Sequence, residues 1–161
     1  SSVMDLVSGY GFARQNYPVR GLFSIPFAGL DINGIPQYYI NGEITSTNID
    51  FQTRDNIDYL KYEGPTDPTI TGSMGNIFTY KGFKLNVFVT YSFGNVVRLN
   101  PCFKYQYSDL SSMPREFKNR WTIGNEEKRT NIPAILSKRQ LEDNRDLIYA
   151  YNAYNLSLIH I

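Results

Sequence analysis

FKLNVFVTYSF, at residues 83–93, carries the clearest structural pattern in the chain. Its odd-numbered positions are all apolar or aromatic, whereas its even-numbered positions are polar except for Phe88. This period of two is typical of a β-strand with one apolar and one polar face. Tilted by about 40°, a strand of this length rises about 28 Å, which is close to the apolar band of an outer-membrane β-barrel. The pattern therefore predicts six lipid-facing side chains, those of Phe83, Leu85, Val87, Val89, Tyr91 and Phe93.

The preceding segment is predicted to pair with this strand in a hairpin. Lys81-Gly82 is typical of a two-residue turn, in which glycine supplies a positive φ. The resulting register pairs Ile70–Tyr80 with Phe83–Phe93 in reverse order, and a shift by one residue would scramble both faces. It also places two glycines opposite aromatic rings, so that each ring can lie on bare backbone: Gly72 opposite Tyr91 and Gly75 opposite Phe88.

Less regular strands are expected on the N-terminal side of this hairpin. Leu22–Leu30 is apolar on both faces, which predicts a strand that is covered on both sides. Asn33-Gly34 favours a type I′ hairpin turn. Pro36 cannot donate a ladder hydrogen bond, so its strand lies at an edge or ends there. The chain is therefore predicted to be all-β and to consist of antiparallel strands and hairpins.

Composition limits the classes of function. The 161 residues include 16 Lys+Arg and 15 Asp+Glu, and this balance argues against a nucleic-acid partner. Aromatic residues make up 15% and charged residues 19%, which together with 12 Gly and 8 Pro favours β structure with many turns. No apolar run reaches the about 18 residues that a membrane helix needs, and no N-terminal signal peptide is recognised. This search does not exclude transmembrane β-strands, because a hydropathy window does not detect their short alternating segments.

A search for catalytic chemistry finds no complete set of residues. The sequence lacks a P-loop, a dinucleotide-binding glycine motif, a zinc-protease motif and a nucleophile elbow. Cys102 is the single cysteine and His160 the single histidine, so Cys102 is interpreted as a small packing thiol without an internal disulfide partner. Asp31–Gly34 begins like a calcium loop but lacks the later ligands, and is interpreted as a turn. We therefore predict no enzyme activity, no cofactor and no metal site.

Short motifs follow one another in a fixed order from about Gly9 to Asn155. They are Tyr17-Pro18-Val19, Leu22-Phe23-Ser24, Phe27-Ala28-Gly29-Leu30-Asp31, Asn41-Gly42-Glu43, Leu60-x-Tyr62-x-Gly64, Asn76-x-Phe78-x-Tyr80-Lys81-Gly82-Phe83-x-Leu85, Tyr91-x-Phe93-Gly94, Arg120-Trp121-Thr122, Gly124-Asn125-Glu126, Thr130-Asn131-Ile132-Pro133 and Tyr149-x-Tyr151-Asn152. Each motif is weak alone, but the ordered set resembles the SusC/RagA family of TonB-dependent outer-membrane transporters. The resemblance implies late strands of a 22-stranded transmembrane β-barrel in the outer membrane of Bacteroidota.

The resemblance also implies a function and partners. Such transporters import glycans or oligopeptides, usually beneath a lid formed by a SusD-like surface lipoprotein, and they draw energy from TonB. Residues 1–155 would then be a partial, incomplete barrel domain that lacks the plug, the TonB box and the closing strands. Residues 156–161 depart from the family and match the translation of a transposon-end adapter used in sequencing libraries, so we interpret them as a non-native tail. In a bilayer, the edge N–H and C=O groups of a few isolated strands would lack hydrogen-bond partners. The functional prediction therefore concerns a longer parent protein.

Membrane topology and contact residues are predicted from the same pattern. The short turn at Lys81-Gly82 is predicted to be periplasmic, and the long loop at residues 95–155 extracellular. A short helix is predicted in that loop with Phe117 and Trp121 on one face, and Trp121 is either a packing anchor or a ligand platform. Because aromatic residues dominate binding hot spots, the candidate contacts with substrate or lid are Tyr105, Tyr107, Trp121, Tyr149 and Tyr151.

Three classes of function follow from the sequence. A segment of a transporter is favoured by the resemblance. A soluble carbohydrate-binding β-sandwich is the alternative, and it requires the apolar face of Phe83–Phe93 to pack against another sheet of the same chain. A stand-alone enzyme is disfavoured because the sequence contains no catalytic set.

Overall fold

The computed structural model describes residues 1–8, 13–45, 49–99, 102–103, 108, 110 and 112–154. Its elements in chain order are α1 (Val3–Ser8), β1 (Gly21–Ser24), β2 (Phe27–Leu30), β3 (Pro36–Ile40), β4 (Glu43–Thr45), β5 (Lys61–Pro65), β6 (Ile70–Tyr80), β7 (Phe83–Phe93), the 3₁₀ helices η1 (Arg115–Asn119) and η2 (Glu126–Lys128), α2 (Lys138–Asp143) and α3 (Arg145–Tyr154). In the described residues strands outweigh helices, and they form the antiparallel sheets β1–β5, β2–β3–β4 and β6–β7. The prediction of antiparallel β structure is confirmed at this level. None of the described helices has the length and apolar character that a membrane crossing demands.

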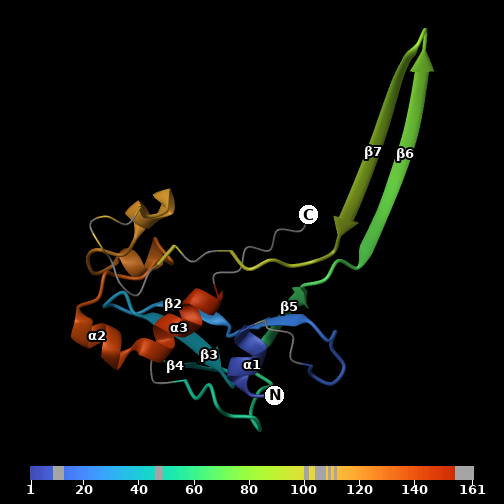
Figure 1. The fold of residues 1–161 in the computed structure, drawn as a ribbon. Coiled ribbons are helices and arrows are strands. Elements are labelled where there is room, and N and C mark those ends of the chain that lie inside the picture. The colour runs from blue at the N-terminus through green and yellow to red at the C-terminus, as the bar shows by residue number, and fades with distance from the viewer. Residues whose placement is uncertain are drawn as a thin grey trace.

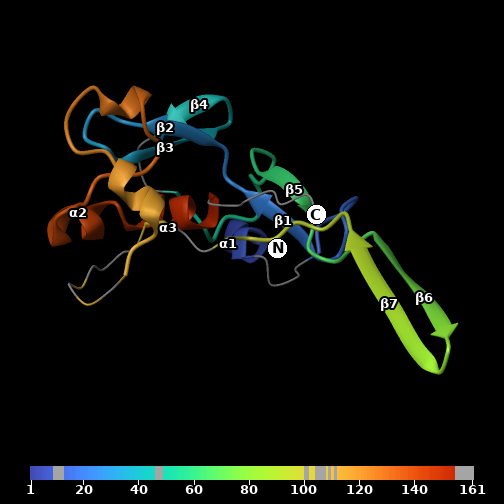
Figure 2. The same ribbon diagram turned by 90° about the horizontal axis from the view of Figure 1, so that it is seen from above.

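The β6–β7 hairpin stands apart from the other elements. Two views at right angles show it projecting from a compact part, which holds the remaining strands and helices (Figures 1 and 2). The turn between β6 and β7 lies at the end farthest from the compact part (Figure 1). The hairpin and the compact part therefore present two separate surfaces.

The register of the hairpin matches the sequence prediction residue for residue. Ile70–Tyr80 pairs with Phe83–Phe93 in reverse order without an irregularity. Lys81 and Gly82 have φ angles of 44° and 86°, and two positive φ values are what a type I′ turn requires. The two-residue turn thus sets the register, and the alternation of apolar and polar residues agrees with it along both strands, except at Asn76 on the apolar face and at Ile77 and Phe88 on the polar face.

Two glycines of β6 make room for aromatic rings of β7. A Cβ built on Gly72 would overlap the Tyr91 ring, and one built on Gly75 would lie 3.0 Å from a ring carbon of Phe88. Each ring therefore lies on bare backbone, as predicted. The Phe88 ring covers glycine backbone on the mostly polar face, which accounts for an aromatic residue at that position.

Leu22–Leu30 forms two strands rather than the single strand predicted. β1 and β2 are separated by Ile25 and Pro26, and they pair in different sheets, with β5 and β3 respectively. The cause is Pro26, which has no N–H for a ladder and restricts the backbone of the residue before it. β1 is buried throughout, whereas β2 is half-buried before Leu30. The predicted burial of both faces is therefore found in β1 and not in β2.

The turn after β2 differs in type from the prediction. Gly34 is the residue of this turn with a positive φ, 75°, whereas a type I′ turn needs two. The Asp31 carboxylate is the reason, because its Oδ1 accepts hydrogen bonds from the N–H groups of Asn33 and Ile35, both at 2.8 Å. The interpretation of Asp31–Gly34 as a turn is confirmed, and Pro36 begins β3, at a strand end as predicted.

The chain after the hairpin supplies part of the core instead of forming a plain loop. The predicted short helix exists as η1 around Phe117, but it ends before Trp121. Two further helices were not predicted from the sequence: α2, whose capping box begins at Ser137, and the longer α3. On β3, the buried Tyr38 donates from its Oη to the Leu147 carbonyl of α3 at 2.7 Å. This hydrogen bond ties α3 to a strand far away in the sequence.

Arg98 fixes the chain where it returns from β7 to the compact part. Its Nη1 donates to the Val7 carbonyl at 2.5 Å, and its Nη2 donates to the Phe23 carbonyl at 3.4 Å. Burial lowers the pKa of this guanidinium, and the nearby Tyr149 acts in the opposite direction. These contacts join the base of the hairpin to α1 and β1.

Candidate functional site

One face of the hairpin is exposed along its whole length and apolar except at Asn76, which pairs with Val87. The six side chains predicted to face lipid alternate along β7 and share this face, with exposed fractions from 40% at Val87 to 82% at Phe83. Apolar side chains of β6 extend the same face opposite them: Ile70, Met74, Phe78 and Tyr80. An exposed apolar surface of this extent marks a site of interaction with a membrane or another protein.

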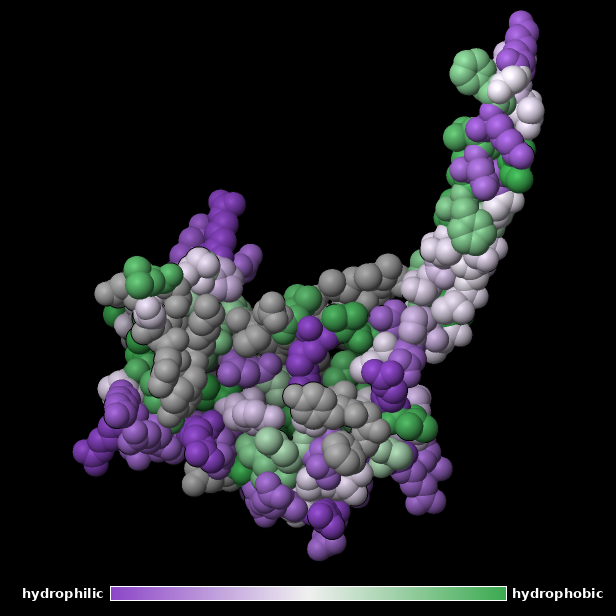
Figure 3. All heavy atoms as spheres, viewed as in Figure 1, coloured by the Kyte–Doolittle hydropathy of each residue, from purple (hydrophilic) through white to green (hydrophobic). Residues whose placement is uncertain are grey.

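The opposite face is mostly polar, and both long edges of the hairpin are unpaired. The polar face carries serines and threonines together with Asn86, while Ile77 and Phe88 are its exposed apolar exceptions. Hydrophobic and hydrophilic side chains lie side by side along the projecting hairpin (Figure 3). Within the described residues β6 and β7 pair only with each other, so each strand presents one edge of free N–H and C=O groups.

The five aromatic residues predicted as substrate or lid contacts have different surroundings. Tyr105 and Tyr107 lie outside the described residues. Tyr151 is 3% exposed, because α3 turns it inward and it packs in the hydrophobic core. Tyr149, two residues earlier on the same helix, is 37% exposed and lines a cavity.

Trp121 packs against the turn at Gly34. A Cβ built on Gly34 would lie 2.7 Å from the indole ring, so only glycine fits at that position. The Trp121 backbone N–H donates to the Ile132 carbonyl at 3.0 Å. Its indole nitrogen is buried and has no hydrogen-bond partner among the described residues. Of the two interpretations of Trp121, these contacts support the packing anchor.

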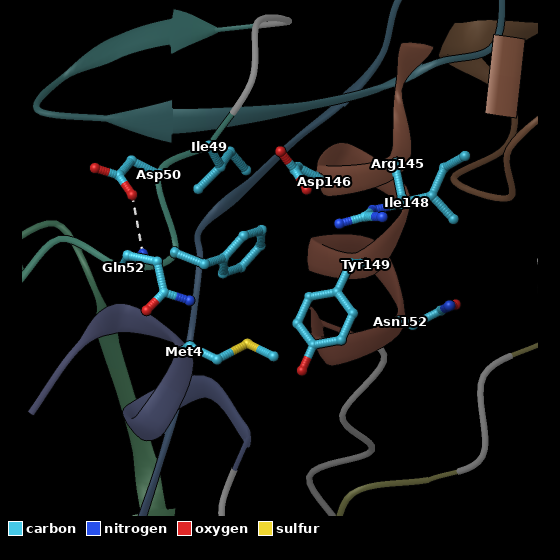
Figure 4. A pocket seen from close by; sticks show the side chains of 10 residues that line it. Met4, Ile49, Asp50, Gln52, Arg145, Asp146, Ile148, Tyr149 and Asn152 are labelled. Carbon is cyan, nitrogen blue, oxygen red and sulfur yellow. Dashed lines mark hydrogen bonds between the residues drawn. The ribbon is translucent and has the colours of Figure 1, made fainter. Parts of the chain in front are cut away.

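The compact part contains a cavity of about 610 Å³, which is within the range of about 300–1,000 Å³ for small-molecule sites. It lies between helix α1, the segment Ile49–Gln52 and helix α3 (Figure 4). Its polar and aromatic lining consists of Asp50, Phe51, Gln52, Arg145, Asp146, Tyr149 and Asn152. The cavity therefore combines aromatic rings with hydrogen-bonding side chains, some of which are negatively and one of which is positively charged.

Side chains of α3, among them Asp146 and Tyr149, point toward the Ile49–Gln52 segment (Figure 4). Arg145 and Tyr149 are four residues apart, which places them on one face of the helix. The Tyr149 ring meets the Phe51 ring edge-on at 5.1 Å between centroids and 87° between planes, and this contact holds its orientation. The Arg145 guanidinium has no ion-pair or hydrogen-bond partner among the described residues.

A second cavity of about 440 Å³ adjoins the first. Ile49 and Asp50 line both cavities, and the second one extends to Asn41 and Glu43 at the β3–β4 turn. Tyr59 also lines it; burial raises the pKa of this phenol, and the charge of Asp50 raises it further. We call the two adjoining cavities the α3 groove.

Sequence reasoning identified only Tyr149 among the residues of the α3 groove. The others come from helices α1 and α3, from strands β3 and β4 with the turn between them, and from the irregular chain between β4 and β5. They form no motif along the chain, because the tertiary packing alone brings them together. A missed signal existed for the helix: Arg145, Tyr149 and Asn152 have the spacing of one helical face.

The described part of the chain holds no group of three or more His, Cys, Asp or Glu side chains placed to bind a metal ion. Cys102 is half-buried. Compared with known proteins, the chain matches no family model and no curated protein.

Proposed function

We propose that this chain forms part of the wall of a SusC/RagA-type, TonB-dependent transporter in the outer membrane, which imports glycans or oligopeptides. The observation that carries the proposal is the β6–β7 hairpin, whose apolar face is exposed from end to end. The ordered motifs that resemble the family support the same function. In this setting the partners are outer-membrane lipid, a SusD-like lipoprotein and, through other parts of the parent protein, the TonB complex.

The hairpin has the dimensions of a transmembrane β-hairpin. Each strand has eleven residues, whereas strands of globular proteins typically have about five or six. Tilted by about 40°, such a strand crosses the roughly 25 Å apolar band of an outer membrane. Barrels of this kind have short periplasmic turns and long extracellular connections. We therefore expect the tip of the hairpin on the periplasmic side and the compact part on the extracellular side.

The unpaired edges of the hairpin support neighbouring strands on both sides. A bilayer core offers no water to the free N–H and C=O groups of β6 and β7, and each unsatisfied group costs several kcal/mol there. Strands of the parent protein on either side would satisfy these groups and close the wall. In water the same edges would promote aggregation.

The soluble carbohydrate-binding β-sandwich is the second candidate function. It requires another sheet of this chain on the apolar face of β7. Within the described residues, the exposed fractions of the side chains on that face run from 40% for Val87 to 82% for Phe83. The other two sheets belong to the compact part (Figure 2). This observation favours the transporter.

Quenching from the lipid phase tests the assignment of the two faces. A fluorophore is attached to a cysteine at Val87 or at Asn86 of the full-length parent protein, with Cys102 replaced by serine, in vesicles that carry nitroxide on the acyl chains. We expect strong quenching at position 87 and weak quenching at 86, because adjacent residues of a strand point to opposite faces. Equal quenching at the two positions, or a monomeric fold that needs neither detergent nor lipid, would contradict the proposal.

Labelling of intact cells tests the membrane topology. A cysteine at Gly124 is expected to react with an impermeant maleimide, since Gly124 is exposed and a Cβ built there meets no atom within 4 Å. A cysteine at Lys81, at the tip of the hairpin, is the matched control and should react only after the outer membrane is permeabilised. Labelling in the reverse order would show that the compact part is periplasmic.

A further inference from the structure

We infer that the α3 groove binds an uncharged oligosaccharide and disfavours acidic sugars. The inference rests on the proposed function, because it names the substrate class that one surface of the proposed transporter would take. Its basis is the chemistry of the groove lining: an exposed aromatic ring, side chains that donate and accept hydrogen bonds, and an excess of carboxylates.

The Tyr149 ring offers a platform for a sugar ring. Aromatic faces carry partial negative charge, so the polarised C–H groups on one face of a pyranose pack against them favourably. The Phe51 and Tyr149 rings meet edge to face with their centroids 5.1 Å apart, and this contact restricts the Tyr149 rotamer. Ligand binding therefore costs little further side-chain entropy at Tyr149. The cavity beside this ring has a volume of about 610 Å³, sufficient for a small-molecule ligand.

The rest of the lining combines apolar and polar groups, as a sugar does with its C–H faces and its hydroxyls. Ile49, Phe51 and Ile148 are 3%, 9% and 1% exposed and form the floor, whereas Met4 and Ile40 are half-buried and Ile44, at the second cavity, is 55% exposed. Gln52 and Arg145 are exposed and polar. Amides and guanidinium groups donate hydrogen bonds, carboxylates accept them, and a sugar hydroxyl does both. An apolar peptide side chain would displace water from these polar groups and would not replace the hydrogen bonds that the water makes to them.

Carboxylates outnumber cations along the groove. Asp50 lines both cavities, Asp146 lines the first and Glu43 the second, while Arg145 is the cation among their described lining residues. A uronic acid or a sulfated sugar would meet repulsion from each carboxylate, and like charges placed together lower affinity. A neutral sugar avoids this repulsion and still uses the carboxylates as acceptors. The charge balance therefore selects uncharged sugars.

Titration calorimetry on the full chain in detergent micelles tests the inference. The neutral probes are hexasaccharides of β-1,4-mannose, β-1,4-glucose, α-1,4-glucose and β-1,4-xylose. The acidic probe is the β-1,4-mannuronate hexasaccharide, which differs from the mannose probe in carrying a carboxylate at carbon 6, and hexa-alanine is the peptide probe. We expect at least one neutral hexasaccharide to bind, and mannuronate to bind at least about fivefold more weakly than the best neutral probe.

Four variants separate binding in the groove from a general structural effect. Tyr149→Ala should weaken binding of the neutral sugar at least about tenfold, whereas Tyr149→Phe keeps the ring and should change it less than about threefold. Asp50→Asn keeps an acceptor for the Gln52 N–H, which lies 2.9 Å away, but removes a charge. This variant should strengthen mannuronate binding about fivefold. Asp67→Asn is the matched control outside the groove lining and should change neither affinity, and Trp121 fluorescence checks that every variant folds.

Three outcomes would each overturn the inference. They are no binding of any neutral hexasaccharide, equal or tighter binding of mannuronate or hexa-alanine, and unchanged sugar binding in folded Tyr149→Ala. None of them bears on the proposed membrane role of the hairpin, because the contrast in lipid quenching between Val87 and Asn86 tests that role separately.

Discussion

Arginine in place of Val87 is expected to reduce correctly inserted parent protein sharply, whereas arginine in place of Asn86 is expected to be mild. Val87 lies near the middle of β7 on the apolar face, and Asn86 lies beside it on the polar face. An arginine at a lipid-facing midplane position of a barrel costs about 2–4 kcal/mol, which corresponds to a roughly 30- to 900-fold shift in the folding equilibrium. A position that faces the interior of the barrel tolerates charge.

The measurement is the fraction of heat-modifiable, folded protein on gels after refolding into lipid vesicles across a urea series. Val89→Arg and Thr90→Arg repeat the contrast one pair farther along the strand, where Val89 is on the apolar face and Thr90 on the polar face. Equal losses for the two members of both pairs would show that the faces are assigned wrongly.

Truncation of Tyr38 is expected to unfold the compact part far more readily than truncation of its neighbour Tyr39. Tyr38 is fully buried, and its Oη donates to the Leu147 carbonyl at 2.7 Å, whereas Tyr39 is 43% exposed. Loss of a fully buried aromatic side chain costs about 3–5 kcal/mol, and loss of the hydrogen bond adds about 1 kcal/mol. Tyr39→Ala should cost less than about 1 kcal/mol, as is usual for exposed positions.

Urea unfolding of the full chain in detergent micelles measures this contrast, with the fluorescence of Trp121 as the probe. Trp121 is the single tryptophan and packs in the compact part against Gly34, so its signal reports on that part alone. Tyr38→Phe isolates the hydrogen bond and should cost about 1 kcal/mol. Similar midpoints for Tyr38→Ala and Tyr39→Ala would contradict the packing described here.

The hairpin could be predicted from the sequence because every signal that defines it is local. The turn at Lys81-Gly82, the period of two and the glycine–aromatic pairs all point to one register, and the structure has that register. The break in Leu22–Leu30 was equally local, since Pro26 stands in the middle of it. The apolar run on both faces masked that signal, because burial of both faces predicts a continuous strand as readily as two strands in different sheets.

The compact part could not be predicted in the same way, because its structure depends on contacts between distant segments. Tyr149 and Tyr151 read alike in the sequence, as two residues of one tyrosine-rich motif. Helix α3 gives them opposite environments, with Tyr151 in the core and Tyr149 at the cavity. Which side of a helix is buried depends on the element that packs against it. For α3 that element is β3, whose Tyr38 donates a hydrogen bond to the Leu147 carbonyl.

Local patterns along the chain were sufficient to predict the long hairpin, its register and its two faces, since turn chemistry and side-chain alternation act between residues that are close in sequence. Three features became visible only in the folded chain: α3 packs on β1 and β3, Trp121 anchors a turn, and Asp50, Arg145 and Tyr149 line one groove. The difference lies in the range of the interactions. Burial in the compact part is settled by non-local packing, which no pattern within a single segment specifies.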